Sequence, residues 1–260
     1  MALRNRLLAA LAGLLALTCS SSPLASQPAK PLQLEVEVLE SYRHDPEAYT
    51  QGLIWLNGHL YESTGHYARS TLRRVDLETG EVLQTVTLPP DFFGEGLAAV
   101  DDRLIQLSWR EQSALVWDLE SLERTGELSY LGEGWGLCYD GRRLYMSDGS
   151  DILTVRDPKT LDEIGRLRVT LSGRPVANLN ELECAEGWIY ANVYQTETLV
   201  RIDGDTGEVR ATIDASALLS SAERQGVDVL NGIAYNEETG SFYLTGKLWP
   251  KLFEVIFVEK

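Results

Sequence analysis

A single glutamate, Glu95, stands between two glycines in the segment DFFGEGLAAV, directly ahead of an apolar run. Glycine on each side indicates that another part of the chain approaches closely or that the backbone takes an unusual conformation. A carboxylate with partly apolar, aromatic surroundings has a raised pKa and can carry a proton between two reacting groups. Glu95 is therefore the candidate acid–base group of this chain.

The segment that begins at Glu95 is one copy of a pattern that recurs along the chain. Each copy is a short strand, a turn rich in Asn, Asp and Gly, and a second strand. The starts of the copies are 44, 40, 45 and 51 residues apart, at Gln51, Glu95, Trp135, Asn180 and Asn231. A second strand–turn–strand unit follows each of the first four copies, so a full period holds four strands. Strands with a period of about 40–50 residues are typical of a β-propeller, and we predict an all-β, five-bladed β-propeller.

The fifth period lacks its fourth strand, because the chain stops after KLFEVIFVEK. The segment LQLEVEVLESY, residues 32–42, has the pattern of a strand and precedes the first period. An N-terminal strand that completes the last blade would close the ring and remove an exposed sheet edge. We therefore expect residues 27–260 to form a single propeller domain closed in this way.

The first residue of each copy is expected near the propeller axis, where the innermost strands converge. A second set lies just beyond the second strand of each copy, at the same end of the ring. Its members are Gly65, Trp109, Gly149, Tyr194 and Lys247. Together the two sets place a carboxylate, a lysine, amides and aromatic rings around one funnel, which is typical of a small-ligand site. Such residues can also serve only to bind channel water and to pack between blades.

The residues of this funnel fit only a few classes of reaction. The chain has no serine or cysteine nucleophile beside a histidine, no phosphate-binding glycine loop, and only three histidines, none with metal-ligand spacing. Amides and Lys247 can stabilise a carbonyl oxygen that gains negative charge. One acid–base group with such stabilisers suits a reaction in which the substrate supplies both nucleophile and leaving group, such as an intramolecular acyl transfer. No metal or other cofactor is expected.

The N-terminus has the pattern of a secretory signal peptide, which we assign to residues 1–26. Arg4 and Arg6 precede an apolar run over residues 7–17, followed by small and polar residues. We expect export to the periplasm or the extracellular space. The segment ALTC also resembles a lipoprotein box, so a lipid anchor on Cys19 is the alternative to ordinary cleavage. No other segment is long and apolar enough to be a transmembrane span.

The net charge of −16 becomes more negative when the two leader arginines are removed. Strong acidity argues against nucleic acid or an anionic membrane as a partner. The remaining cysteines, Cys138 and Cys184, fit either a disulfide in an exported chain or two buried small side chains.

The segments YRHDPEAYTQGL, FFGEGL, NLNELE and VLNGIAYNEETGSFYLTGKLWPKLFEV resemble the plant and bacterial type of glutaminyl-peptide cyclotransferase. The resemblance extends from about Tyr42 to Val255. It implies conversion of an N-terminal glutaminyl residue to pyroglutamate with release of ammonia. It also implies peptides or proteins with N-terminal glutamine as partners, for a protein that we expect to be a monomer.

The resemblance assigns roles to individual residues. Glu95 would move a proton from the attacking amine to the departing one, and Gln51, Asn180 and Lys247 would bind the amide and amine. We take Glu95, Lys247 and Asn180 as catalytic. The substrate-binding residues are then Gln51, Tyr49, Phe93, Trp109, Trp135, Tyr194 and Asn231. Tyr194 stands where the family pattern has tryptophan, which leaves an aromatic face of smaller size.

Two other functions compete with this interpretation. A metal-dependent propeller lactonase would hold a cation on the axis, and Glu95, Asn180 and Asn231 imitate its ligand set. Hard cations prefer several carboxylate oxygens, however, and Lys247 would repel them. A non-catalytic propeller that binds peptides on its aromatic rim is the second alternative; a titratable glutamate among aromatic walls favours catalysis over it.

Overall fold

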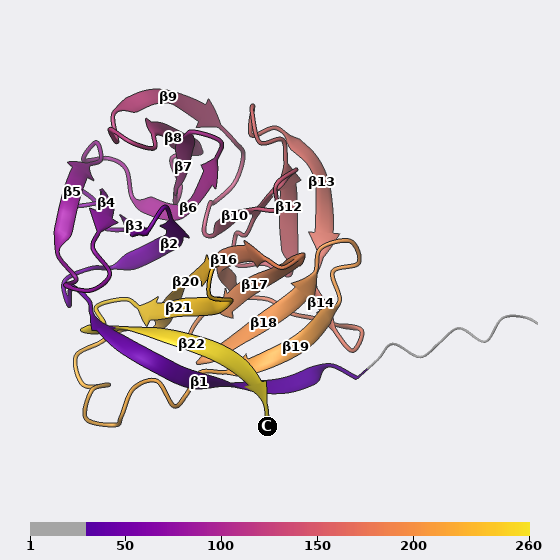
Figure 1. The fold of residues 1–260 in the computed structure, drawn as a ribbon. Helices are drawn as coiled ribbons and strands as arrows, with labels where there is room; N and C mark the ends of the chain where they lie inside the picture. Colours follow the sequence, from indigo (N-terminus) through magenta and orange to yellow (C-terminus); the bar gives the residue numbers. More distant parts are fainter. Residues whose placement is uncertain (1–29) are drawn as a thin grey trace, which may run out of the picture.

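The computed structural model describes residues 30–260, which form strands and turns without a helix. None of the described residues forms a helix that could cross a membrane. The signal peptide expected at residues 1–26, with Cys19, lies outside the described range. The strands form a ring of five blades around a central axis (Figure 1), so the predicted five-bladed propeller is confirmed.

The first three blades are separate four-stranded antiparallel sheets. Blade 1 contains β2 (Thr50–Leu56), β3 (His59–Thr64), β4 (Thr71–Val75) and β5 (Val82–Thr87). Blade 2 contains β6 (Gly94–Val100), β7 (Arg103–Ser108), β8 (Ser113–Asp118) and β9 (Arg124–Ser129). Blade 3 contains β10 (Leu137–Tyr139), β11 (Leu144–Met146), β12 (Ile152–Arg156) and β13 (Glu163–Arg168). A small hairpin, β14 (Thr170–Leu171) and β15 (Arg174–Pro175), follows blade 3.

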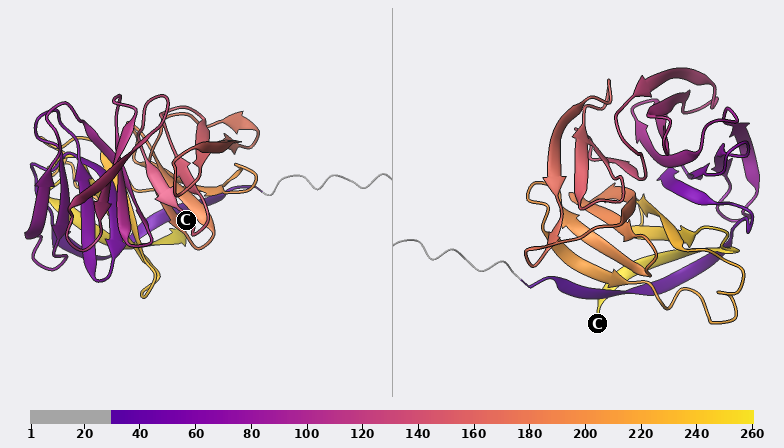
Figure 2. Two further views of the ribbon diagram at one scale, coloured as in Figure 1. Left: turned by 90° about the horizontal axis from the view of Figure 1, so that it is seen from above. Right: turned by 180° about the vertical axis from the view of Figure 1, so that it is seen from behind.

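The last two blades share one strand. Blade 4 contains β16 (Leu179–Ala185), β17 (Trp188–Val193), β18 (Thr198–Asp203) and β19 (Val209–Asp214). Blade 5 contains β20 (Leu230–Asn236), β21 (Ser241–Gly246), β22 (Lys251–Glu259) and β1 (Leu32–Arg43). The N-terminal β1 pairs antiparallel with β22, which confirms the predicted closure. Its first residues also pair in parallel with β19, from Leu32 opposite Ala211 to Glu35 opposite Asp214. Blades 4 and 5 therefore form one continuous eight-stranded sheet, which the view from behind shows clearly (Figure 2).

The innermost strands approach one another very closely at the axis, and this explains the glycine after Glu95. A Cβ atom on Gly96 would lie 2.6 Å from the backbone nitrogen of Leu137 in the next blade. The Gly96 amide instead donates to the Trp135 carbonyl at 2.7 Å. Any side chain here would push blades 2 and 3 apart at the point where Glu95 is positioned.

A disulfide joins the innermost strands of two neighbouring blades. Cys138 of β10 and Cys184 of β16 are bonded, with their Cα atoms 5.4 Å apart. The bond ties blade 3 to blade 4 near the axis, so of the two alternatives for these cysteines the structure shows the disulfide.

Candidate active site

A cavity of about 370 Å³ opens at one end of the ring, and nine of the ten predicted site residues line it. Its lining is Tyr49, Gln51, His66, Phe93, Glu95, Trp109, Trp135, Asn180, Tyr194 and Lys247. The repeat explains this convergence. Gln51, Glu95 and Asn180 lie at the beginnings of innermost strands, whereas Trp109 and Lys247 directly follow the second strands of their blades.

Glu95 is the buried acid of the cavity, with 4% of its surface exposed. The side-chain amide of Gln51 donates to its Oε1 atom at 3.0 Å. Burial raises the pKa of Glu95 well above its ordinary value; the positive charge of Lys247 opposes this, and the negative charges of Glu111 and Glu133 add to it. A carboxyl group with a raised pKa is a stronger base than an ordinary glutamate, so it can accept a proton from one group and return it to another.

Asn231, expected among the substrate-binding residues, does not line the cavity. Its side chain is fully buried behind Gln51, where its Nδ2 atom donates to the Thr50 carbonyl at 3.0 Å and to Gln51 Oε1 at 3.4 Å. The axis brings all five strand starts together, but the NH2 group of the Asn231 side chain makes its hydrogen bonds to β2, and its Oδ1 atom is buried without a hydrogen-bond partner. In this structure Asn231 orients Gln51, and Gln51 in turn holds Glu95.

Lys247 places its ammonium group among aromatic rings. The Nζ atom lies 4.7 Å from the ring centre of Tyr49 and 5.3 Å from that of Tyr194. Burial lowers the pKa of Lys247, and the carboxylates of Glu95 and Asp228 partly oppose the shift. Tyr194 thus supplies the aromatic face expected at this position, as half of a cation–π pair around the lysine.

Aromatic side chains form the wall of the cavity. The rings of Phe93 and Trp109 lie 5.7 Å apart, and those of Trp135 and Tyr194 meet edge to face at 5.6 Å. Gly149 makes room for one of them: its φ is +81°, and a Cβ atom there would lie 2.7 Å from Cη2 of Trp135. Glycine is therefore required at position 149 by the aromatic ring next to it.

His66 is the cavity residue that sequence reasoning missed. Its ring lies 4.6 Å from the ring of Tyr49. Burial lowers its pKa, and the positive charges of Arg69 and Lys247 add to this shift, so the imidazole is neutral at neutral pH. His66 directly follows Gly65, one of the five residues expected just beyond the second strands of the blades, and this position indicated that it could lie at the cavity.

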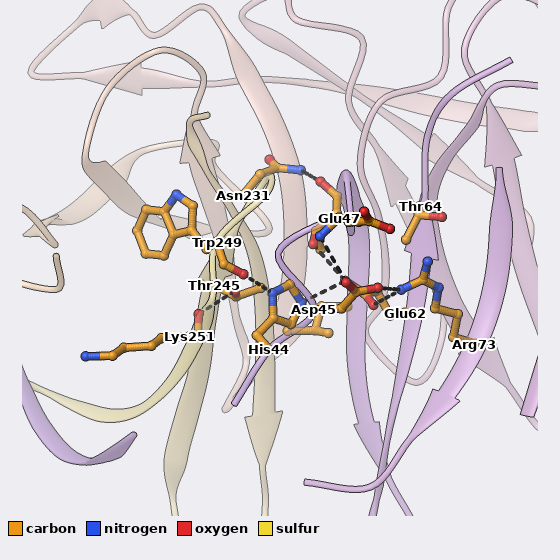
Figure 3. A network of polar contacts seen from close by, with 12 residues as sticks. His44, Asp45, Glu47, Glu62, Thr64, Arg73, Asn231, Thr245, Trp249 and Lys251 are labelled. Atoms are coloured by element: carbon orange, nitrogen blue, oxygen red, sulfur yellow. Dashed lines mark hydrogen bonds and ion pairs between the residues drawn. The ribbon is translucent and has the colours of Figure 1, made fainter. Parts of the chain in front are cut away.

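A buried polar cluster around His44 and Glu62 holds two strands of the site in place (Figure 3). His44 Nδ1 lies 2.7 Å from the Trp249 carbonyl, and its Nε2 lies 3.0 Å from Glu62 Oε1. Thr50, the neighbour of Gln51, donates to the same Glu62 oxygen at 2.7 Å. The cluster therefore connects the start of β2 with the turn that follows Lys247.

Backbone hydrogen bonds complete this connection. The amide of Leu248 donates to the Ala48 carbonyl at 2.7 Å, and the amide of His44 donates to the Pro250 carbonyl at 3.0 Å. The segment 44–51, which carries Tyr49 and Gln51, is thus fixed to the segment 247–250, which carries Lys247.

Within residues 30–260, no three His, Cys, Asp or Glu side chains gather in a way that could hold a metal ion. The groups that do converge are a carboxyl with a raised pKa, an ammonium group with a lowered one, and side-chain amides inside an aromatic wall. Fold and site together define a propeller with an acid–base centre, suited to acyl transfer within a bound substrate.

The comparisons with known proteins agree with this class. The chain matches the glutamine cyclotransferase family over residues 9–257 and belongs to it. It is 39% identical over 226 residues to a glutaminyl-peptide cyclotransferase of Arabidopsis thaliana, covering 85% of this chain and 71% of the relative. The crystal structure of Myxococcus xanthus glutaminyl cyclase is similar with a TM-score of 0.82 and 40% identity, covering 89% of this chain and all of the other. The predicted family is confirmed.

Proposed function

We propose that this protein converts N-terminal glutaminyl residues of peptides or proteins to pyroglutamate and releases ammonia. The observation that carries the proposal is the buried Glu95 carboxyl, held by Gln51 inside a cavity that Lys247 and Asn180 also line. Family membership selects this reaction among the acyl transfers open to such a site.

The proposed reaction is intramolecular. The neutral α-amine of the substrate attacks the carbon of its own side-chain amide, and a new C–N bond forms while the carbonyl becomes an oxyanion. Glu95 as a carboxylate takes a proton from the attacking nitrogen. It then gives that proton to the departing nitrogen as the old C–N bond breaks, so the products are the lactam and ammonia and Glu95 is regenerated.

Lys247 and Asn180 are assigned to the developing negative charge. Both are buried, with 4% and 3% of their surface exposed, so their interactions with an oxyanion are not screened by bulk water. Gln51 keeps the Glu95 carboxyl oriented, and the aromatic wall takes the apolar part of the glutaminyl side chain.

We also propose that the protein works outside the cytoplasm, after removal of a signal peptide at residues 1–26 or with a lipid anchor on Cys19. The disulfide between Cys138 and Cys184 supports an oxidising compartment, where such bonds form and persist. Mass spectrometry of the mature N-terminus would distinguish a free cleaved end from a lipid-modified Cys19.

The first experiment measures ammonia release from a short peptide that begins with glutamine. A peptide that begins with asparagine and one with a blocked α-amine serve as controls, and each reaction is run with and without a metal chelator. Ammonia from the free glutaminyl peptide alone, unchanged by chelator, is the expected result. No ammonia from folded protein would refute the proposed reaction, and loss of activity with chelator would refute the mechanism through Glu95.

A further inference from the structure

One carboxylate on the rim accepts hydrogen bonds from two tryptophans of the cavity wall. Oε2 of Glu133 lies 2.8 Å from Nε1 of Trp109 and 3.1 Å from Nε1 of Trp135. Its other oxygen accepts a hydrogen bond from Arg110 Nε at 3.0 Å. The Arg110 guanidinium also stacks 3.6 Å from the ring centre of Trp109. Neither Glu133 nor Arg110 lines the cavity itself.

The loop that carries Glu133 is fixed to the same tryptophan by its backbone. The next residue, Gly134, donates its amide to the Trp109 carbonyl at 3.0 Å, and Trp135 follows immediately. Trp109 belongs to blade 2 and Trp135 precedes the first strand of blade 3. Glu133 therefore connects the cavity walls of two adjacent blades.

Both tryptophans are only partly buried, so packing alone does not fix their rings. A carboxylate that accepts from both indoles makes two charge-assisted hydrogen bonds, which are shorter and stronger than neutral ones. Without it each indole N–H can turn to water, and the orientation of the rings is held only by packing, such as that of Arg110 on Trp109 and of Gly149 against Trp135. A preorganised wall binds its ligand more tightly than a mobile one, because less side-chain freedom is lost on binding.

We propose that Glu133 is a positioning residue that fixes Trp109 and Trp135 in the orientation needed to bind the glutaminyl substrate. It acts through the two indoles, not on the reacting atoms, so its contribution is to KM more than to kcat. The inference rests on the proposed function for its substrate.

Glu111 provides a matched control on the same rim. Its negative charge, like that of Glu133, raises the pKa of Glu95, but its side chain accepts from the Tyr67 hydroxyl at 2.9 Å, from the backbone amides of Arg110 at 3.3 Å and Phe93 at 3.5 Å, and from no indole. Replacing either glutamate by alanine removes one negative charge near Glu95. Only the Glu133 variant releases the tryptophans.

The experiment compares KM and kcat of Glu133→Ala, Glu133→Gln and Glu111→Ala for the same N-terminal glutaminyl peptide. We expect KM to rise about tenfold in Glu133→Ala, to change less than about twofold in Glu111→Ala, and to be partly restored in Glu133→Gln, whose amide oxygen can still accept from indoles. Because both alanine variants remove a negative charge near Glu95, both should move the acid limb of kcat to lower pH.

The affinity of the wild type and variants for the pyroglutamyl product, followed by tryptophan fluorescence, gives a readout independent of turnover. An unchanged KM in Glu133→Ala, or an equal rise in both alanine variants, would overturn the proposal. If Glu133→Ala does not fold, Glu133→Leu, which fills the space but has no acceptor for the indoles, takes its place, and an unchanged KM in that variant has the same meaning. Absence of activity in the wild type would instead refute the proposed reaction.

Discussion

Two buried glutamates of adjacent blades, Glu62 on β3 and Glu95 on β6, have opposite electrostatic properties. They are equally hidden, with 2% and 4% of their surface exposed. Glu62 accepts from His44 and Thr50 and lies 3.8 Å from an Arg73 nitrogen. Glu95 accepts one hydrogen bond, from the neutral amide of Gln51.

The neighbouring side chains decide whether the pKa of each glutamate is raised or lowered. Burial alone would raise the pKa of both carboxyls. At Glu62, the charge and hydrogen bond of His44, with Arg73 and Thr50, outweigh burial and lower the pKa. At Glu95, burial prevails over the charge of Lys247 and the pKa is raised. Glu62 therefore keeps its negative charge to lower pH than an ordinary glutamate and holds the structure together, whereas Glu95 is an acid that can change its protonation state.

The largest expected difference is in stability. Glu62→Ala removes the buried carboxylate that pairs with His44 and accepts from Thr50, and breaking a buried pair in this way costs about 3–5 kcal/mol. Glu95→Ala removes a carboxyl that has no paired charge and faces an open cavity, so we expect little loss. The free energies of unfolding of both variants are measured by urea denaturation, and an unchanged m-value shows that the change is one of stability. Equal losses at the two positions would contradict the distinction.

The next effect is on the rate. Glu95→Gln should keep the fold and substrate binding but lower kcat by roughly 10²-fold or more, because the amide cannot carry the proton. Steady-state ammonia release gives kcat and KM, and circular dichroism checks the fold. A variant with nearly normal kcat would show that Glu95 is not the acid–base group.

A smaller loss is expected from Lys247→Ala. If the ammonium group stabilises the oxyanion, kcat should fall roughly tenfold to a hundredfold, the range for a hydrogen bond to a charged group. Because Lys247 also lowers the pKa of Glu95, the acid limb of kcat should move to higher pH in the variant. A change in KM alone would make Lys247 a binding residue only.

The smallest expected effect is on the pH dependence of stability, which should have opposite signs for the two glutamates. The pKa of His44 is raised: burial lowers it, but the charge and hydrogen bond of Glu62 prevail. The stability that this pair contributes is therefore complete below the ordinary histidine value of 6.5 and is lost as pH rises through the raised pKa of folded His44. At acidic pH the lowered pKa of Glu62 limits the same contribution to stability. It is fully present above 4.5 and is lost as pH falls through the pKa of Glu62 in the folded protein.

Melting temperatures of wild type, Glu62→Ala and Glu95→Ala across this pH range test the prediction. The deficit of Glu62→Ala should grow as pH rises through the lowered folded pKa of Glu62 toward 4.5, because the wild type gains the contribution of the Glu62 carboxylate there. Glu95→Ala should gain relative to wild type as pH rises above 4.5, because it avoids ionising a buried carboxyl. Parallel curves for the two variants would refute the assignment of opposite pKa shifts.

The sequence determined the features that repeat locally. Strand–turn–strand periods of regular length specify the blades, and closing a ring of blades brings the first residues of the innermost strands to one axis. For this reason the sequence alone places Gln51, Glu95 and Asn180 in one site, with Lys247 and Trp109 on its rim.

Only the tertiary structure decided which partners meet across the ring. His44 is hydrogen-bonded to the Trp249 carbonyl, 205 residues away in the sequence, and the parallel pairing of β1 with β19 joins two further segments from opposite ends of the described chain. Side-chain packing between blades leaves Asn231 outside the cavity lining, places His66 in it, and brings Glu133 within hydrogen-bond distance of two indoles. Local sequence periodicity carries no record of such contacts. The chain therefore encodes where its acids lie, and the folded ring determines whether each one holds a charge or exchanges a proton.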